Sequence, residues 1–148
     1  MKTKQMGAAL IELALILPLF LLLTFITTEF GRAIYQYNTI TKSVRDAVRY
    51  LSVQTPGTHF NEAKNLVVYG KPSIEGTENP LALGLQLAHV EDPVWQIAGT
   101  NPVINTVTIT VSGYRFTPLL TNVFGIAFSN AEGEIPFGSI SATMRAPL

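Results

Sequence analysis

The chain has 148 residues, which is enough for one membrane helix and one small domain. Its ten basic and ten acidic residues give zero formal charge, which argues against nucleic-acid binding as its main task. It contains no cysteine, so disulfides, thiolate metal sites and cysteine nucleophiles are all excluded.

An apolar run covers residues 8–28 and contains a single charged residue, Glu12. A run of about 20 residues matches the ~30 Å hydrocarbon core of a bilayer at 1.5 Å rise per residue. Lys2 and Lys4 precede it, so the excess of positive charge predicts a cytoplasmic N-terminus. We therefore predict a single-pass transmembrane helix followed by an extracytoplasmic C-terminal part. Pro18 is expected to bend this helix mildly.

The helix is predicted to continue beyond the membrane as an amphipathic segment, residues 29–52. Apolar side chains recur there at spacings of three and four, which places them on one helical face. They are Phe30, Ile34, Tyr37, Ile40, Val44, Val48 and Leu51. Pro56 and Gly57 end the pattern, because proline disfavours helix at the residue before it. The two segments together predict a rod of roughly 65 Å.

Residues 57–148 change to turn residues and short β-like runs, and they are predicted to form one exported domain. The clearest strand is 106–112, where every second residue is apolar and β-branched, namely Val107, Ile109 and Val111. Weaker β-like runs lie at residues 66–69, 85–90 and 139–145. A one-sided sheet and a striped helix must each cover an apolar face. We therefore predict an α+β fold in which a small antiparallel sheet packs on the long N-terminal helix.

Side chains suited to enzyme chemistry are sparse. The sequence has no glycine-rich phosphate loop, serine elbow or metal-spaced histidine pair. His59 and Glu62 lie three residues apart, and His89 lies near Glu91 and Asp92, so each group could form half of a metal or acid–base site. Solvated loop residues are the simpler interpretation. We predict no catalytic residue, no metal site, no cofactor, no small-molecule substrate and no nucleic-acid partner.

The carboxylate of Glu12 needs an explanation, because a charged group at the middle of a membrane helix costs about 2.5–3.5 kcal/mol, and less near an end. It could simply reach toward the cytoplasmic head groups. Alternatively, a cut after Gly7 would make Ala8 a new N-terminus and Glu12 the fifth residue of the mature chain. The carboxylate, about one helical turn away, could then neutralise the α-amino group of its own or a neighbouring subunit. Loss of residues 1–7 would also remove Lys2 and Lys4.

The short basic leader, Gly7, a small residue and Glu12 resemble the processing signature of type IV pilins and pseudopilins. The wider pattern resembles a TadE-like pseudopilin of the tight-adherence (Tad/Flp) pilus system. The resembling segments are residues 7–18, 29–32, 47–50, 65–70 and 116–119. At one position the chain departs from the family, which often has an aromatic residue where Leu13 stands.

This resemblance implies that a prepilin peptidase removes the leader, residues 1–7, in the bacterial inner membrane. It further implies a minor pilin-like subunit that works in pilus assembly and cell adhesion. The implied partners are other pilin or pseudopilin subunits, the pilus assembly platform, the prepilin peptidase and membrane lipid.

An apolar segment at residues 119–128 lies between two strand candidates, where the tip of a hairpin would be exposed. It could be a patch that contacts a partner or the membrane, but burial against the sheet is the plainer interpretation. The residues that would form such a patch are Leu119, Leu120, Val123, Phe124, Ile126 and Phe128.

Two other classes of function stay open at this point. The chain could be an uncleaved, membrane-tethered binding module whose segment 119–128 receives an envelope partner. It could also be a secreted enzyme released by signal peptidase. The N-terminal residue of the protein separates the three classes: Ala8 for the pseudopilin, Met1 for the module, and a residue near Ala33 for the secreted form.

Overall fold

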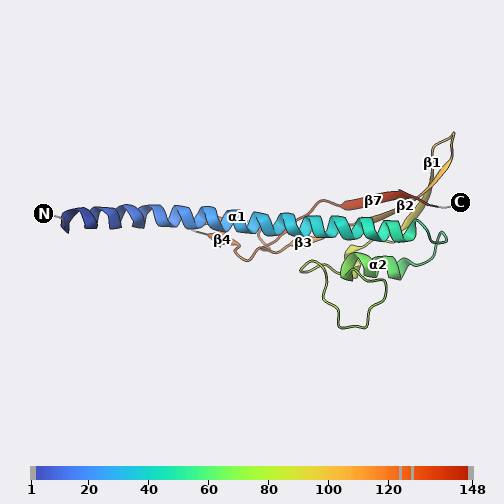
Figure 1. Cartoon of the computed structure of the whole chain (residues 1–148), viewed down its shortest axis with the longest axis horizontal. Helices are drawn as coiled ribbons and strands as arrows, with labels where there is room; N and C mark the ends of the chain where they lie inside the picture. Colours follow the sequence, from blue (N-terminus) through green and yellow to red (C-terminus); the bar gives the residue numbers. More distant parts are fainter. Residues whose placement is uncertain (1–2, 124, 128, 147–148) are drawn as a thin grey trace.

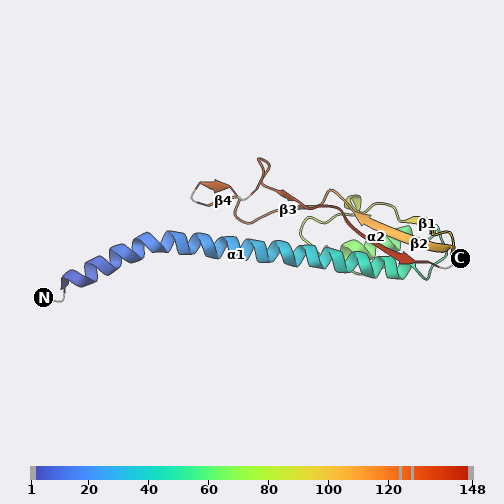
Figure 2. The ribbon, with the colours of Figure 1, turned by 90° about the horizontal axis from the view of Figure 1, so that it is seen from above.

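The computed structural model describes residues 3–123, 125–127 and 129–146. One helix, α1 (Thr3–Leu51), extends along almost the whole length of the molecule (Figure 1). The predicted continuous helix is therefore confirmed, and it begins before Gly7, because a single glycine costs a helix only about 1 kcal/mol. Figure 2 shows that α1 bends within its blue first half, the part that contains Pro18.

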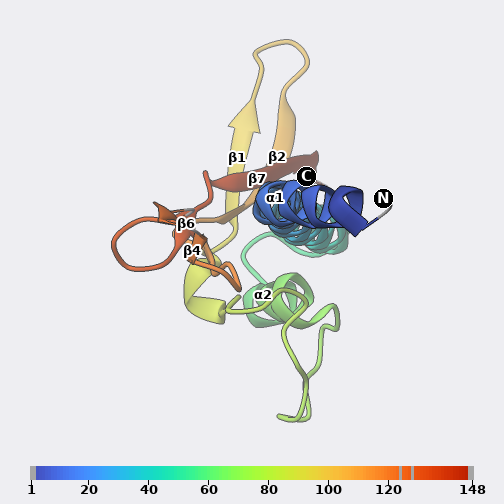
Figure 3. The same ribbon diagram turned by 90° about the vertical axis from the view of Figure 1, so that its left-hand side faces the viewer.

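The second half of α1 lies between a short helix and a small sheet (Figure 3). The helix is α2 (Phe60–Tyr69). The sheet is antiparallel with strand order β1-β2-β7, formed by β1 (Val94–Ala98), β2 (Ile104–Val111) and β7 (Ile140–Arg145). The predicted α+β fold, with an antiparallel sheet packed on a long N-terminal helix, is confirmed.

Strand β2 carries the apolar face that closes the core. Val107, Ile109 and Val111 are all buried, as their alternation predicts. Ile109 stands opposite Ala142 of β7 in the antiparallel register. From the helix side, the core receives Ile40, Val44, Ala47, Val48 and Leu51. The helix thus supplies a large part of the core of the C-terminal domain, as predicted from the need to cover both apolar faces.

Two of the β-like runs are not strands. Residues 66–69 belong to α2, whose Ala63 and Val67 lie four residues apart and are buried in the core shared with α1. Packing on α1 therefore outweighs the strand preference of the valines. The helix ends at Gly70, whose φ of 74° is the left-handed conformation that glycine adopts easily.

Residues 85–90 form a short 3-10 helix, η1 (Leu87–His89), instead of a strand. The Gln86 N–H donates a hydrogen bond to His89 Nδ1 over 3.1 Å, and this contact closes the turn. Only Val90 makes a β-bridge, to Val111. Leu85 and Val90 are buried while the residues between them are not, which fits a turn and not an alternating strand.

The chain between β2 and β7 forms an arm that extends along α1, away from the sheet (Figures 1 and 2). Two short strand pairs build this arm, which we define as residues 114–137. The first pair is β3 (Arg115–Phe116) with β6 (Ile135–Pro136), and the second is β4 (Asn122–Val123) with β5 (Ile126–Ala127). The arm therefore brings residues of the C-terminal domain back toward the apolar half of α1.

Candidate functional site

The first half of α1 exposes its apolar side chains all round. Every residue of the run 8–28 is exposed except Leu22, which is half-buried. The helix is long and apolar enough to cross a membrane, and it is the single such helix among the residues described. An apolar surface of this extent requires a cover of lipid or of other helices. α1 is therefore suited to act as a single-pass membrane anchor.

Three predicted processing and assembly residues lie on this anchor. Gly7, Ala8 and Glu12 are all exposed and all lie within α1, so one unbroken helix connects the proposed cleavage point to the carboxylate. At 1.5 Å per residue, Ala8 and Glu12 are about 6 Å apart along the helix axis. Their roles in cleavage and in neutralising an N-terminus stay predictions.

A charged cluster marks the end of the apolar run. Arg32 Nη1 donates to both carboxylate oxygens of Glu29, at 3.0 and 2.7 Å. The backbone N–H of Leu119, on the arm, donates to the same carboxylate over 3.2 Å. The Glu29 side chain is only 13% exposed as a result. The arm therefore covers a charge that would otherwise face the lipid boundary, where an unpaired charge is costly.

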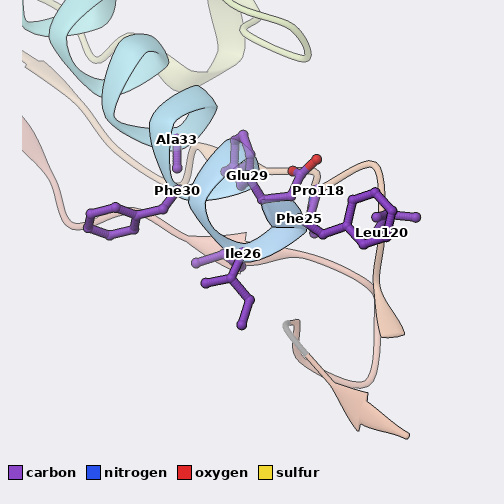
Figure 4. Close-up of a pocket in the computed structure, with 9 residues that line it drawn as sticks. Phe25, Ile26, Glu29, Phe30, Ala33, Pro118 and Leu120 are labelled. Atoms are coloured by element: carbon purple, nitrogen blue, oxygen red, sulfur yellow. The ribbon is translucent and has the colours of Figure 1, made fainter. Parts of the chain in front are cut away.

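The arm and α1 enclose an apolar cavity beside this cluster (Figure 4). The cavity has a volume of about 140 Å³. The helix lines it with Phe25, Ile26, Glu29, Phe30 and Ala33, and the arm with Phe116, Pro118, Leu120 and Ile135. A space of this size that is almost wholly lined by apolar atoms suits an acyl chain or an apolar side chain and not a polar substrate.

Aromatic residues connect the arm to the helix further along. The Arg32 guanidinium lies 5.4 Å from the centre of the buried Phe116 ring, as a cation–π contact. Phe137 packs edge-on against Tyr37 of α1 and against Tyr114, with ring centroids 5.8 and 5.4 Å apart. The base of the arm is therefore fixed on the helix by ring packing.

The Tyr114 hydroxyl is the polar centre of this base, although the residue is only 2% exposed. It lies 2.6 Å from Gln36 Oε1 and 2.8 Å from the Leu83 carbonyl oxygen. The Tyr114 hydroxyl has one proton and can donate it to only one of these two oxygens. If the side-chain amide of Gln36 is flipped, its NH2 group donates to the Tyr114 hydroxyl, which then donates to the Leu83 carbonyl, so both contacts are hydrogen bonds. Burial raises the pKa of the Tyr114 hydroxyl, and the positive charge of Arg32 lowers it in part.

Tyr114→Phe is expected to lower the free energy of unfolding by about 1–2 kcal/mol at neutral pH, because the part-buried hydrogen bonds of its hydroxyl to Gln36 and to the Leu83 carbonyl are lost. The native pKa is raised, so the native state keeps its proton where the unfolded tyrosine, with a pKa of about 10, loses it. The advantage of wild type is therefore complete below about pH 10 and declines above it. Urea unfolding of the full chain in detergent, followed from pH 7 to pH 11, measures both effects.

Tyr35→Phe is the matched control, since the Tyr35 side chain is largely exposed on α1. We expect its free energy of unfolding to stay within about 0.5 kcal/mol of wild type. Equal losses for the two variants would show that the Tyr114 hydroxyl has no special part in holding the arm.

The predicted patch at residues 119–128 is not buried against the three-stranded sheet. It lies at the far end of the arm, where Leu119 is exposed and Leu120 is half-buried against the cavity. Val123 and Ile126 lie in the paired strands β4 and β5. Phe124 and Phe128 lie outside the described residues. Burial against the sheet, the plainer interpretation of this segment, is therefore not what the described residues show, and contact of the segment with a partner or the membrane stays a prediction.

The histidines considered for metal or acid–base chemistry have local structural partners. His59 Nδ1 lies 2.7 Å from the Thr58 hydroxyl, and His89 Nδ1 accepts the hydrogen bond that closes η1. Asp92 pairs with Lys64 over 2.6 Å. In the part of the chain that the structure describes, no three His, Cys, Asp or Glu side chains are grouped so that they could hold a metal ion.

Sequence reasoning missed the part that Glu29, Arg32 and Tyr114 play. The signal that could have identified Glu29 and Arg32 is their i,i+3 spacing, which is that of a helical ion pair. No local pattern marks Tyr114, because its partners are 78 and 31 positions away in the chain.

Comparison with known proteins gives one family. The model of the TadE-like protein family matches residues 7–49, which comprise the apolar run and most of its amphipathic continuation. This match confirms the resemblance stated above for the N-terminal part of the chain. No curated protein and no solved structure matches the chain.

Proposed function

We propose that this TadE-like protein is a minor pilin-like subunit for assembly of a Tad/Flp-type pilus. A prepilin peptidase would cut it after Gly7 in the bacterial inner membrane, with the N-terminus in the cytoplasm and the domain of residues 57–148 outside. Its partners would be other pilin or pseudopilin subunits, the assembly platform and membrane lipid, and its contribution to cell adhesion would be structural. We propose no catalytic activity for it.

The observation that carries the proposal is the position of the family match. It begins at Gly7, the residue before the proposed cut, and it includes Glu12. The same α1 continues without a break from this point into the core of the exported domain. Such a subunit can transmit a pull on its exported domain to its anchor, as extraction into a filament requires.

The energetics of assembly also support a role for Glu12. Lipid tails are as apolar as leucine side chains, so moving the run 8–28 from lipid to a bundle of sibling helices gains little from the hydrophobic effect. Polar contacts between helices then decide which bundle forms. A new α-amino group at Ala8 and a carboxylate at Glu12 would provide one such contact in each subunit.

The test is the N-terminal residue of protein recovered from the membrane of the producing bacterium. We expect Ala8 in cells with an active prepilin peptidase and Met1 when that peptidase is inactivated. Met1 in both strains would contradict the proposal and favour a tethered binding module, for which the exposed Leu119 provides a contact surface. A start near Ala33 in soluble material would favour the secreted form.

A further inference from the structure

The hairpin of β4 and β5 lies level with the anchor, although it belongs to the exported domain. Figures 1 and 2 both place it beside the blue half of α1, nearer the N-terminus of the helix than β3. Pro118 and Leu120, which lead into it, share a cavity with Phe25 and Ile26. These two helix residues lie about 3–5 Å inside the end of the apolar run at Thr28. A bilayer that covers the run therefore also meets the hairpin.

The composition of the hairpin is suited to this position. No Asp, Glu, Lys or Arg occurs between Arg115 and Glu132. Arg115 pairs with Glu132 over 2.7 Å and with Glu134 over 3.2 Å, so the charges at the edge of the segment are gathered in one cluster at the base of the arm. Leu119 is 72% exposed, and Thr121 and Asn122 beside it are uncharged. An exposed apolar side chain with neutral polar neighbours is typical of the boundary between head groups and acyl chains.

We propose that the β4–β5 hairpin, described over residues 119–123 and 125–127, rests in the interfacial layer of the bilayer on the exported side, with Leu119 against the acyl chains. The occupant of this surface is lipid, because the surface is continuous with the membrane anchor itself. The inference rests on the membrane anchor of the proposed function, and it requires neither cleavage after Gly7 nor pilus assembly.

This second membrane contact has a mechanical consequence. The Leu119 N–H donates a hydrogen bond to Glu29, and Phe137 at the base of the arm packs against Tyr37 of α1, so these contacts couple the hairpin to α1. A hairpin seated at the surface therefore limits how far α1 can slide along the membrane normal. It sets the depth of the anchor before the subunit leaves the bilayer.

Single-cysteine variants of the full chain test the contact, because the natural sequence has no cysteine to remove. An environment-sensitive fluorophore is attached to Leu119→Cys, and to Leu83→Cys as the matched control, a leucine that is 64% exposed beside the base of the arm. Leu19→Cys, within the run 8–28, reports the anchor. The proteins are reconstituted in nanodiscs of phosphatidylethanolamine and phosphatidylglycerol. One set of discs carries lipids with a nitroxide near the head-group end of the acyl chain.

We expect the fluorophore at position 119 to emit at shorter wavelength than at position 83. Nitroxide lipids should quench it several-fold more strongly, and aqueous iodide several-fold less. Equal behaviour at 119 and 83, with position 19 in lipid, overturns the hairpin contact while the anchor stands. Strong iodide quenching at position 19 overturns the anchor and the hairpin contact together. Protection at position 119 that disappears when each disc holds one copy overturns lipid as the occupant and assigns the surface to a second copy.

Discussion

Ile109→Ala is expected to lower the free energy of unfolding of the C-terminal domain by about 2–5 kcal/mol. Ile109 is fully buried in β2, opposite Ala142, and belongs to the cluster that includes Ile40 and Val44 of α1. The substitution removes three carbon atoms and leaves a cavity between sheet and helix. Stabilities of small domains are of order 5–15 kcal/mol, so this loss is a large fraction of the total.

The measurement is urea unfolding of the full chain in detergent, followed by the fluorescence of its single tryptophan, Trp95. Trp95 lies in β1 opposite Val107 and packs edge-on against Phe60 of α2, with centroids 5.5 Å apart. Its emission therefore reports separation of the sheet from the helices. The anchor should stay in the micelle throughout, because its apolar surface does not depend on the sheet.

Ile97→Ala is the matched control for this loss. It makes the same chemical change in the neighbouring strand β1, where Ile97 is 75% exposed. We expect its effect to stay within about 0.5 kcal/mol. If Ile109→Ala and Ile97→Ala lower the free energy of unfolding equally, burial of Ile109 between β2 and α1 does not stabilise the domain. The packing of the sheet on the helix would then not be what holds the domain together.

The elements that sequence analysis predicts well are those whose signal is local and periodic. The alternation around Val107 and the three-and-four spacing from Ile40 to Leu51 depend only on neighbours in the chain, and the structure buries both sets. The same helical stripe predicts burial for Phe30 and Ile34, which stay exposed because the sheet does not extend that far along α1. The pattern indicates which face of a helix is apolar, but not how much of that face a partner covers.

The arm could not be predicted for a different physical reason. Its strands are two residues long, too short for a period to develop. Its position depends on contacts between distant residues, such as Leu119 with Glu29 across 90 positions. The sequence nevertheless indicates that segment 119–128 contacts another apolar surface, because it is an apolar stretch without charges. The identity of that surface follows only from the fold.

Glu12→Gln is expected to reduce piliation by about 3- to 30-fold while leaving the protein in the membrane. Polar contacts between membrane helices contribute about 0.6–2 kcal/mol each, and 1.4 kcal/mol corresponds to a factor of ten in an equilibrium. Neutral glutamine is cheaper than a carboxylate to place in lipid, so insertion of the run 8–28 should not suffer. What is lost is the charge that would neutralise the α-amino group of Ala8 in the proposed bundle.

Counting pili by electron microscopy, with membrane fractions quantified in parallel, measures both outcomes. Glu12→Asp is the matched control, because it keeps the charge and shortens the side chain by one methylene group, so piliation should fall less than in Glu12→Gln. The N-terminal residue is determined for each variant, and Ala8 in all of them assigns the loss to assembly and not to processing. Normal piliation of Glu12→Gln would contradict the role of this carboxylate, since an uncharged amide would then serve equally well in the helix bundle.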